Sequence, residues 1–237
     1  MLDHLTSGKN AALIHDLDTQ LTHQMTLTAV GSVTTFATTM QCLYDLAAHP
    51  QMVQVLRDEV IAVKESTSGT MFDKESIQHL NKMDSFMKES QRLSSPDLTT
   101  FQRAATADIT LPDGTFIPKG TKLETATCAI HADDANYENA TQFDGLRFYR
   151  SRKMDGEENK HMFVSVGPKD LAFGIGRHAC PGRFLSNIVI KLILSEFLLN
   201  YDIRLPDGAS RPTNIEYEIS VSHPYSPGHL IFYCYVV

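Results

Sequence analysis

Apolar residues recur at helical spacing through most of the first hundred residues. Within residues 51–64, for example, Val53 and Leu56 fall on one face of a helix. A preceding helical run must end at Pro50, because proline lacks the backbone N–H that a helix interior needs. The spacing predicts helices over residues 16–47, 51–64 and 82–93, with a short capped helix near Asp73 and Ser76.

The pattern changes to short strand-like segments after about residue 108. Residues 108–120 predict a hairpin around the turn pair Asp113-Gly114. Further strands are predicted over 122–127, 201–205, 217–222 and 230–236, irregular chain over 131–170, and a last helix over 181–199. Because no repeat or linker interrupts the chain, we expect a mainly α fold with small peripheral β-sheets and a single partial domain over residues 1–237.

The composition is that of a globular protein. The 237 residues are 42% hydrophobic, which excludes an intrinsically disordered chain. A net charge of −7 argues against a nucleic-acid-binding protein, which normally carries a basic surface. The four cysteines are scattered, so neither a zinc site nor a disulfide framework is predicted. With no apolar span and no signal-peptide pattern, the chain as written is expected to be cytoplasmic and to lack a membrane anchor.

One glycine-rich segment delivers a cysteine to the start of the last predicted helix. Residues 173–184 read Phe-Gly-Ile-Gly-Arg-His-Ala-Cys-Pro-Gly-Arg-Phe. Cys180 would lie where free backbone N–H groups and the positive helix end favour an anion, so its thiolate would suit a metal ion. Gly174 and Gly176 lack a Cβ and would admit a flat cofactor. The competing interpretation of a lone cysteine is a buried structural residue.

The segment resembles the haem-binding loop of the cytochrome P450 family, whose pattern is Phe-x-x-Gly-x-Arg/His-x-Cys-x-Gly. Five residues fill that pattern: Phe173, Gly176, His178, Cys180 and Gly182. The resemblance implies the C-terminal portion of the cytochrome P450 fold. It also implies heme b (iron protoporphyrin IX) as the cofactor, bound at these residues, with Cys180 as the thiolate ligand of the iron.

An acid and a base stand three residues apart at Glu89 and Arg92, on one face of a predicted helix. Taken alone, the pair is most simply a solvated ion pair. In the family that the chain resembles, Glu-x-x-Arg is buried and completed by a later arginine, which Arg147 in Phe-Asp-Gly-Leu-Arg-Phe would supply. The resemblance therefore gives these three residues a structural role, as supports of the segment that leads to Cys180.

The first helix carries Val-Gly-Ser-Val-Thr-Thr, which resembles the oxygen-site segment of the family. The resemblance implies that Gly31 leaves room for O2 and that Thr34, with Thr35, hydrogen-bonds the oxygen and its water chain. The competing interpretation is threonines packed in a helix interior. Val33 departs from the family pattern, because it stands where an acid or a histidine helps to relay protons.

Two further features concern the cofactor and the electron donor. Arg103 occupies a position that often contacts a haem propionate in the family, although a surface arginine is the competing interpretation. Residues 145–183 hold eight basic and four acidic residues within a chain that is acidic as a whole. A basic surface there would suit an acidic electron donor, which the resemblance identifies as NADPH-cytochrome P450 reductase; a solvated charged loop is the alternative.

The resemblance implies a haem-thiolate monooxygenase of fungal type, inserting one oxygen atom of O2 into a hydrophobic substrate. A terpenoid or another secondary metabolite is the expected substrate class, by analogy with the fungal members. Family members are about twice as long, and in full length they are anchored in the endoplasmic reticulum membrane. The alternatives are a truncated, non-catalytic haem-binding fragment, and a haem-thiolate binder that performs isomerase, peroxide-driven or sensing chemistry without a reductase.

Overall fold

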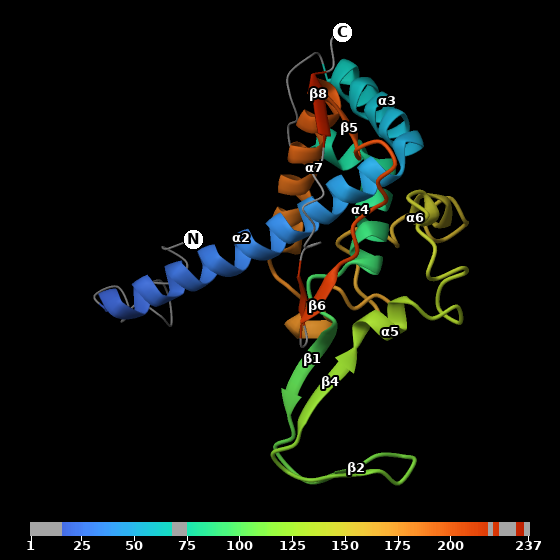
Figure 1. The fold of residues 1–237 in the computed structure, drawn as a ribbon. Helices are drawn as coiled ribbons and strands as arrows, with labels where there is room; N and C mark the ends of the chain where they lie inside the picture. Colours follow the sequence, from blue (N-terminus) through green and yellow to red (C-terminus); the bar gives the residue numbers. More distant parts are fainter. Residues whose placement is uncertain (1–15, 68–74, 218–219, 223–230, 235–237) are drawn as a thin grey trace. The chain divides into compact units, whose positions relative to one another are not determined.

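The computed structural model describes residues 16–67, 75–217, 220–222 and 231–234 (Figure 1). The chain divides into two units at Phe36, and the division falls inside the long helix α2 (Leu17–Ala48) rather than in a linker. The expectation of one partial domain over residues 1–237 stays a prediction. No described helix combines the length and the apolarity that crossing a membrane requires.

The described part of the first unit is the N-terminal portion of α2. The Asp16 carboxylate accepts hydrogen bonds from the Thr19 backbone N–H (3.0 Å) and from the Thr19 hydroxyl (2.7 Å). These bonds lower the pKa of Asp16 and satisfy a donor at the helix start, as an N-cap residue does. The predicted helix start is confirmed. In this unit the helix side chains are exposed or half-buried.

The second unit is built on a helical core. The end of α2 packs with α3 (Pro50–Ser66), α4 (Asn81–Leu93) and α7 (Arg183–Asn200). Pro50 is the first residue of α3, a position where its missing N–H costs no hydrogen bond, so the predicted break between two helices is confirmed. The innermost side chains are fully buried and mostly aliphatic: Leu46, Leu56, Val60, Leu80, Met83, Phe86, Met87, Ile190, Leu194 and Leu198.

The short helix predicted near Asp73 is the 3-10 turn η2 (Ser76–His79), and Asp73 itself lies outside the described residues. The next helix, α4, receives its N-terminal cap from α3. Glu59 accepts the backbone N–H groups of Lys82 (2.7 Å) and Met83 (2.9 Å), and burial raises the pKa of this carboxyl. Capping from a neighbouring helix fixes where α4 begins.

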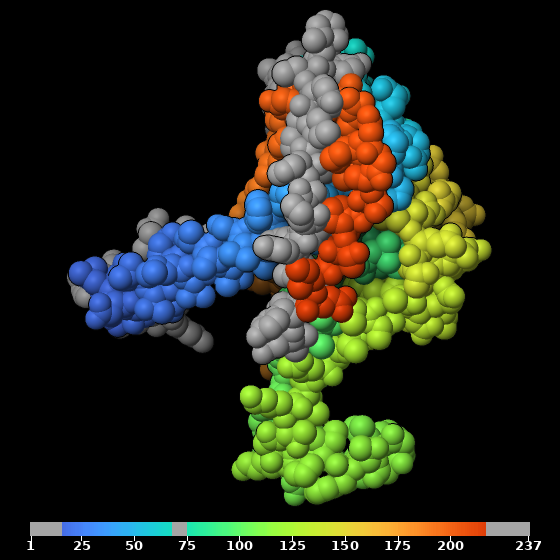
Figure 2. All heavy atoms as spheres, viewed as in Figure 1, coloured from blue at the N-terminus to red at the C-terminus, as the bar shows by residue number. Residues whose placement is uncertain are grey.

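The described strands pair as four two-stranded antiparallel sheets. They are β1 (Thr99–Ala104) with β4 (Lys122–Ala126), β2 (Ile109–Thr110) with β3 (Phe116–Ile117), β5 (Tyr201–Arg204) with β8 (Ile231–Cys234), and β6 (Ile215–Tyr217) with β7 (Ser220–Ser222). The β1–β4 ribbon and the β2–β3 hairpin extend away from the helices of the second unit (Figures 1 and 2). A mainly α architecture with small peripheral sheets is confirmed.

Three local predictions need correction. The single strand expected over 217–222 is wrong, because β6 ends at Tyr217 and β7 begins at Ser220. The expected irregular stretch over 131–170 contains α6 (Arg147–Ser151). The chain also forms α5 (Thr127–His131), which begins at the last residue of the strand predicted over 122–127. Both missed helices have five residues, which is too short for helical periodicity to show in a sequence.

Candidate functional site

The cysteine segment folds into a closed loop directly before α7. The loop contains the 3-10 turn η3 (Gly176–His178), and its backbone N–H of Cys180 donates to the carbonyl of Phe173 at 2.8 Å. Gly174 and Gly176 have φ of 70° and 69°, the left-handed region that residues with a Cβ rarely adopt. The glycines are therefore needed for the loop to turn back on itself.

The thiol of Cys180 is unbridged and half-buried, and it stands two residues before Gly182, the N-cap residue of α7. A Cβ at Gly182 would lie 3.9 Å from the Cys180 Sγ, while one at Gly176 would meet no heavy atom within 4 Å. The loop thus offers a soft sulfur ligand with open space on one side. A thiolate at such a helix start is a suitable ligand for a transition metal.

Two side chains fasten this loop to the chain that precedes it. The Phe173 ring meets the buried Phe163 ring edge-on, with centroids 5.2 Å apart. Arg183 donates to the carbonyl of Cys180 (2.6 Å) and to that of Val164 (3.1 Å). The arginine that follows the cysteine therefore holds the loop backbone.

Two predicted cofactor residues bond locally. His178 is exposed, and its Nε2 accepts a hydrogen bond from the Arg177 Nε at 3.0 Å. Arg103 lies in β1, where its guanidinium donates to the Gln102 carbonyl (2.7 Å) and lies 4.8 Å from the centroid of the Phe101 ring. His178 is exposed and Arg103 is half-buried, so an anionic group has access to both side chains.

The predicted oxygen-site residues belong to the first unit and Cys180 to the second, so each group is described by itself. Gly31 and Thr34 are exposed and Thr35 is half-exposed. The Thr34 hydroxyl donates to the carbonyl of Val30 at 2.9 Å, a bond inside its own helix. Val33, the departure from the family pattern, is 61% exposed.

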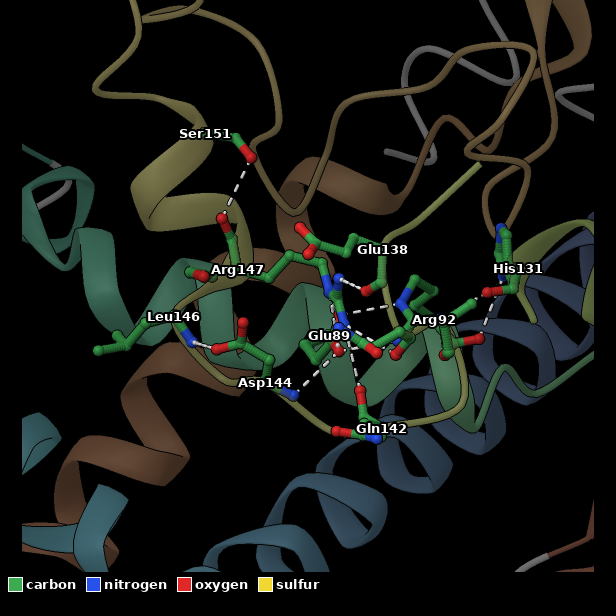
Figure 3. A network of polar contacts seen from close by, with 12 residues as sticks. Glu89, Arg92, His131, Glu138, Gln142, Asp144, Leu146, Arg147 and Ser151 are labelled. Atoms are coloured by element: carbon green, nitrogen blue, oxygen red, sulfur yellow. Dashed lines mark hydrogen bonds and ion pairs between the residues drawn. The ribbon is translucent and has the colours of Figure 1, made fainter. Parts of the chain in front are cut away.

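Glu89, Arg92 and Arg147 meet in one buried cluster (Figure 3). The Glu89 carboxylate is fully buried and accepts the Arg92 Nε (2.9 Å) and Nη2 (2.8 Å), a two-bond contact. The Arg147 Nε bonds the same carboxylate at 3.1 and 3.2 Å, and the backbone N–H of Asp144 adds a fourth donor group at 3.0 Å. The structure therefore places the acid between both bases.

The remaining N–H groups of the two arginines bond backbone carbonyls of the segment that follows α5. Arg92 bonds the carbonyls of His131 and Ala140, and Arg147 bonds those of Glu138 and Gln142 (Figure 3). Each arginine thus joins the buried carboxylate to backbone carbonyls at the end of α5 or in the loop that follows it. The cluster orders the chain between α5 and α6.

Sequence reasoning missed a second polar cluster, which joins α2 and α4 to the chain before β6. Asp45 is buried and bonds the hydroxyl of Ser90 and the guanidinium of Arg211. Asn214 donates to Ser94 at 2.9 Å and accepts from the Gln41 amide at 3.0 Å. Its members are separated by up to 173 residues, so no local pattern could have revealed it.

A sequence model of the family described as cytochrome P450 matches residues 2–232 of this chain. The chain belongs to the cytochrome P450 family. Among curated relatives, cytochrome P450 monooxygenase AN1598 of Emericella nidulans is 39% identical over 197 residues, which is 83% of this chain and 36% of that protein. Ent-kaurene oxidase of Gibberella intermedia is 37% identical over 199 residues, covering 82% of this chain and 37% of that protein.

A solved structure of a zebra fish cytochrome P450 with abiraterone superposes with a TM-score of 0.67 at 23% identity. The match covers 86% of this chain and 45% of that one, and it establishes the fold as part of the cytochrome P450 fold. The chain spans little more than a third of the length of the curated relatives named above. The family's cofactor is haem. The unbridged Cys180 thiol and the open space next to Gly176 fit this cofactor.

Proposed function

We propose that this cytochrome P450 chain forms the haem-binding portion of a monooxygenase that acts on a hydrophobic substrate. The observation that carries the proposal is the closed Cys180 loop, with its unbridged thiol just before α7. Heme b, when bound, supplies the redox chemistry that activates O2 and transfers one oxygen atom to the substrate.

Several of the chain's own residues would hold that cofactor. Cys180 would bind the iron through its thiolate, and Gly176 and Gly182 would keep the loop close to the flat ring because they carry no Cβ. His178 and Phe173 would complete the loop's contact with the ring. Arg103 would bond a propionate, since a guanidinium pairs well with a carboxylate.

The resemblance to the family also supports a role in oxygen activation for three residues of α2. Thr34 and Thr35 would offer hydroxyl protons, and Gly31 would leave room for O2. Val33 carries no titratable group, so proton delivery at this position would depend on the threonine hydroxyls and on water. Glu89, Arg92 and Arg147 would support the site without touching substrate, because each is committed to the buried cluster.

The names of the relatives support a finer assignment. One relative is an ent-kaurene oxidase, and ent-kaurene is a terpenoid hydrocarbon. We therefore assign the substrate to the terpenoids or to similar apolar secondary metabolites of fungi. The electron donor would be NADPH-cytochrome P450 reductase, attracted by the basic residues of 145–183.

The test is the carbon monoxide difference spectrum of the reduced, haem-loaded chain. The wild type should give the Soret band of a thiolate-ligated haem, and Cys180→Ala should abolish it. Cys128→Ala is the matched control, because Cys128 is an exposed, unbridged cysteine in α5 and its loss should leave the spectrum unchanged.

Two outcomes would decide against this function. If the folded chain takes up no haem, the haem-thiolate assignment is wrong. If it takes up haem with a Cys180-dependent spectrum but shows no NADPH consumption with substrate and added reductase, the chain is a haem binder and not a monooxygenase.

A further inference from the structure

The ring of His131 joins two backbone segments that lie far apart in the sequence. His131 is the last residue of α5 and is buried, with 2% of its surface exposed. Its Nδ1 lies 3.2 Å from the carbonyl oxygen of Arg92, and its Nε2 lies 3.3 Å from the backbone nitrogen of Leu171. Because a backbone N–H can only donate, Nε2 is the acceptor. Nδ1 therefore carries the hydrogen and donates a hydrogen bond to the Arg92 carbonyl.

One of these two partners belongs to the buried cluster. Arg92 pairs with Glu89, and a second N–H group of its guanidinium bonds the backbone carbonyl of His131 (Figure 3). His131 is therefore tied to Arg92 twice, through its ring and through its backbone. These two bonds attach the imidazole to α4.

The other partner, Leu171, stands just before the cysteine loop in the sequence. The carbonyl of Leu171 accepts the N–H of Gly174 at 2.8 Å, and the carbonyl of Phe173 accepts the N–H of Cys180 at 2.8 Å. Leu171 itself is buried. A short series of backbone bonds thus connects the imidazole to the residue that carries the thiol.

The charged groups around the imidazole are consistent with a neutral ring. Burial lowers the pKa of His131; the charge of Asp170 and the hydrogen bond with the Arg92 carbonyl oppose this effect, while the positive charges of Arg92 and Lys88 reinforce it. Asp170 is itself paired with Lys88. The ring of Tyr137 packs edge-on against the imidazole, with centroids 6.3 Å apart.

We propose that His131 is a positioning residue for the Cys180 loop, which it holds by accepting the N–H of Leu171 while donating to Arg92. The inference rests on the proposed function, because it gives the loop its task as the support of the metal ligand. A histidine that merely filled space would need neither bond. If His131 only filled space, replacing it with another polar side chain would have the same effect whether the new side chain took the place of Nδ1 or of Nε2.

Two substitutions separate the two ring nitrogens. In His131→Gln the amide oxygen reaches the place of Nε2 and can still accept the Leu171 N–H. In His131→Asn the shorter amide reaches only the place of Nδ1, so the bond to Arg92 can form while Leu171 loses its acceptor. Tyr137→Phe is the control, since it removes a bond to the Lys169 carbonyl (2.7 Å) near Leu171 and keeps the ring that packs against the imidazole.

The first readout is hydrogen exchange of the Leu171 amide in the 237-residue chain, with the amides of α4 as internal reference. The loss of one hydrogen bond should speed this exchange by about fivefold in His131→Asn, while His131→Gln and Tyr137→Phe remain close to wild type. The second readout is the thiolate-type fraction of the carbon monoxide spectrum, which should fall in His131→Asn and recover in His131→Gln.

Equal exchange at Leu171 in the Asn and Gln variants would overturn the proposal, whether both resemble wild type or both are faster. Faster amide exchange throughout α4 in both variants would also overturn the proposal, because it would indicate that His131 only packs the core. If Leu171 separates the two variants but the wild type binds no haem, the positioning role stands and the proposed function fails.

Discussion

The buried charge of Glu89 has several partners. The Glu89 carboxylate faces two guanidinium groups and a backbone N–H, and no part of it reaches solvent. Removing a charge from water costs several kcal/mol, which only close and well-aligned partners can offset. The cluster is therefore sensitive to loss of any one member.

We expect Glu89→Gln to destabilise the fold by about 3–5 kcal/mol, because it leaves the buried Arg92 and the half-buried Arg147 without a counter-charge. Thermal or denaturant unfolding of the apo chain measures this cost. The control is Glu157→Gln, which weakens a solvent-accessible contact with Lys160 and His161 and should cost far less, because water screens such pairs. Similar losses in both variants would contradict the importance of burial here.

The pH dependence of stability should carry a contribution from His131. Burial lowers its pKa in the folded state, so the neutral form is favoured there. Above the unfolded-state pKa of about 6.5, His131 is neutral in both the folded and the unfolded chain, so its full contribution to stability is present. Below that pH the unfolded chain binds a proton at His131 before the folded chain does, so the free energy of unfolding falls. The midpoint of unfolding between pH 7 and 5 should therefore fall less steeply in His131→Gln than in wild type. A slope unchanged by the substitution would count against a neutral histidine.

Two helices of the core are joined by a buried ion pair. Lys191 of α7 lies 2.8 Å from the Asp84 carboxylate of α4, and only 2% of its side chain is exposed. The other Asp84 oxygen accepts the backbone N–H of Phe163 at 2.8 Å, on the segment that leads to the cysteine loop. The pair therefore sets the register of α4 against α7 and fixes where that segment begins.

Lys191→Met should destabilise the chain by about 3–5 kcal/mol, because it leaves the Asp84 carboxylate buried without its closest cation. Adding Asp84→Asn should restore part of the loss, since the asparagine oxygen can still accept the Phe163 N–H. Denaturant unfolding of both single variants and of the double variant gives the coupling. Strictly additive losses would mean that the two side chains do not depend on one another.

On the scale of the whole molecule, charge is unevenly distributed. The chain carries a net charge of −7, yet within residues 145–183 the eight basic residues outnumber the four acidic ones. Several of these bases are committed inside the fold, Arg147 and Arg183 among them, while Lys153 and Lys169 are exposed. Only the exposed bases are available to attract an acidic partner.

Changing Lys153 and Lys169 to glutamate should weaken the interaction with the reductase. The KM for reductase in NADPH-driven turnover should rise about five- to tenfold and become less dependent on salt, because charge attraction mainly governs encounter. Lys119→Glu, an exposed lysine next to β3, is the control and should change neither quantity. An effect of Lys119→Glu as large as that of the double variant would indicate a general effect of net charge.

Local rules were sufficient for most helices, for the hairpin and for the loop. The break at Pro50, the turn at Asp113-Gly114 and the glycines at 174 and 176 act through backbone geometry within a few residues. The resemblance to the family also identified Glu89, Arg92 and Arg147 as one group, although the first two are 55 or more residues from the third. The ion-pair cluster was recognisable because the family resemblance named Arg147 as the third partner.

The sequence by itself determined the family, the mainly helical fold and the candidate cysteine, because each depends on local spacing or on a short motif. Only the tertiary structure decided which polar groups are buried together. Lys191, which interrupts an apolar run, proved to be a core residue because Asp84 faces it. His131 gained its place between Arg92 and Leu171 in the same way. Desolvation and hydrogen-bond geometry depend on three-dimensional neighbours, and the order of residues along the chain does not contain them explicitly.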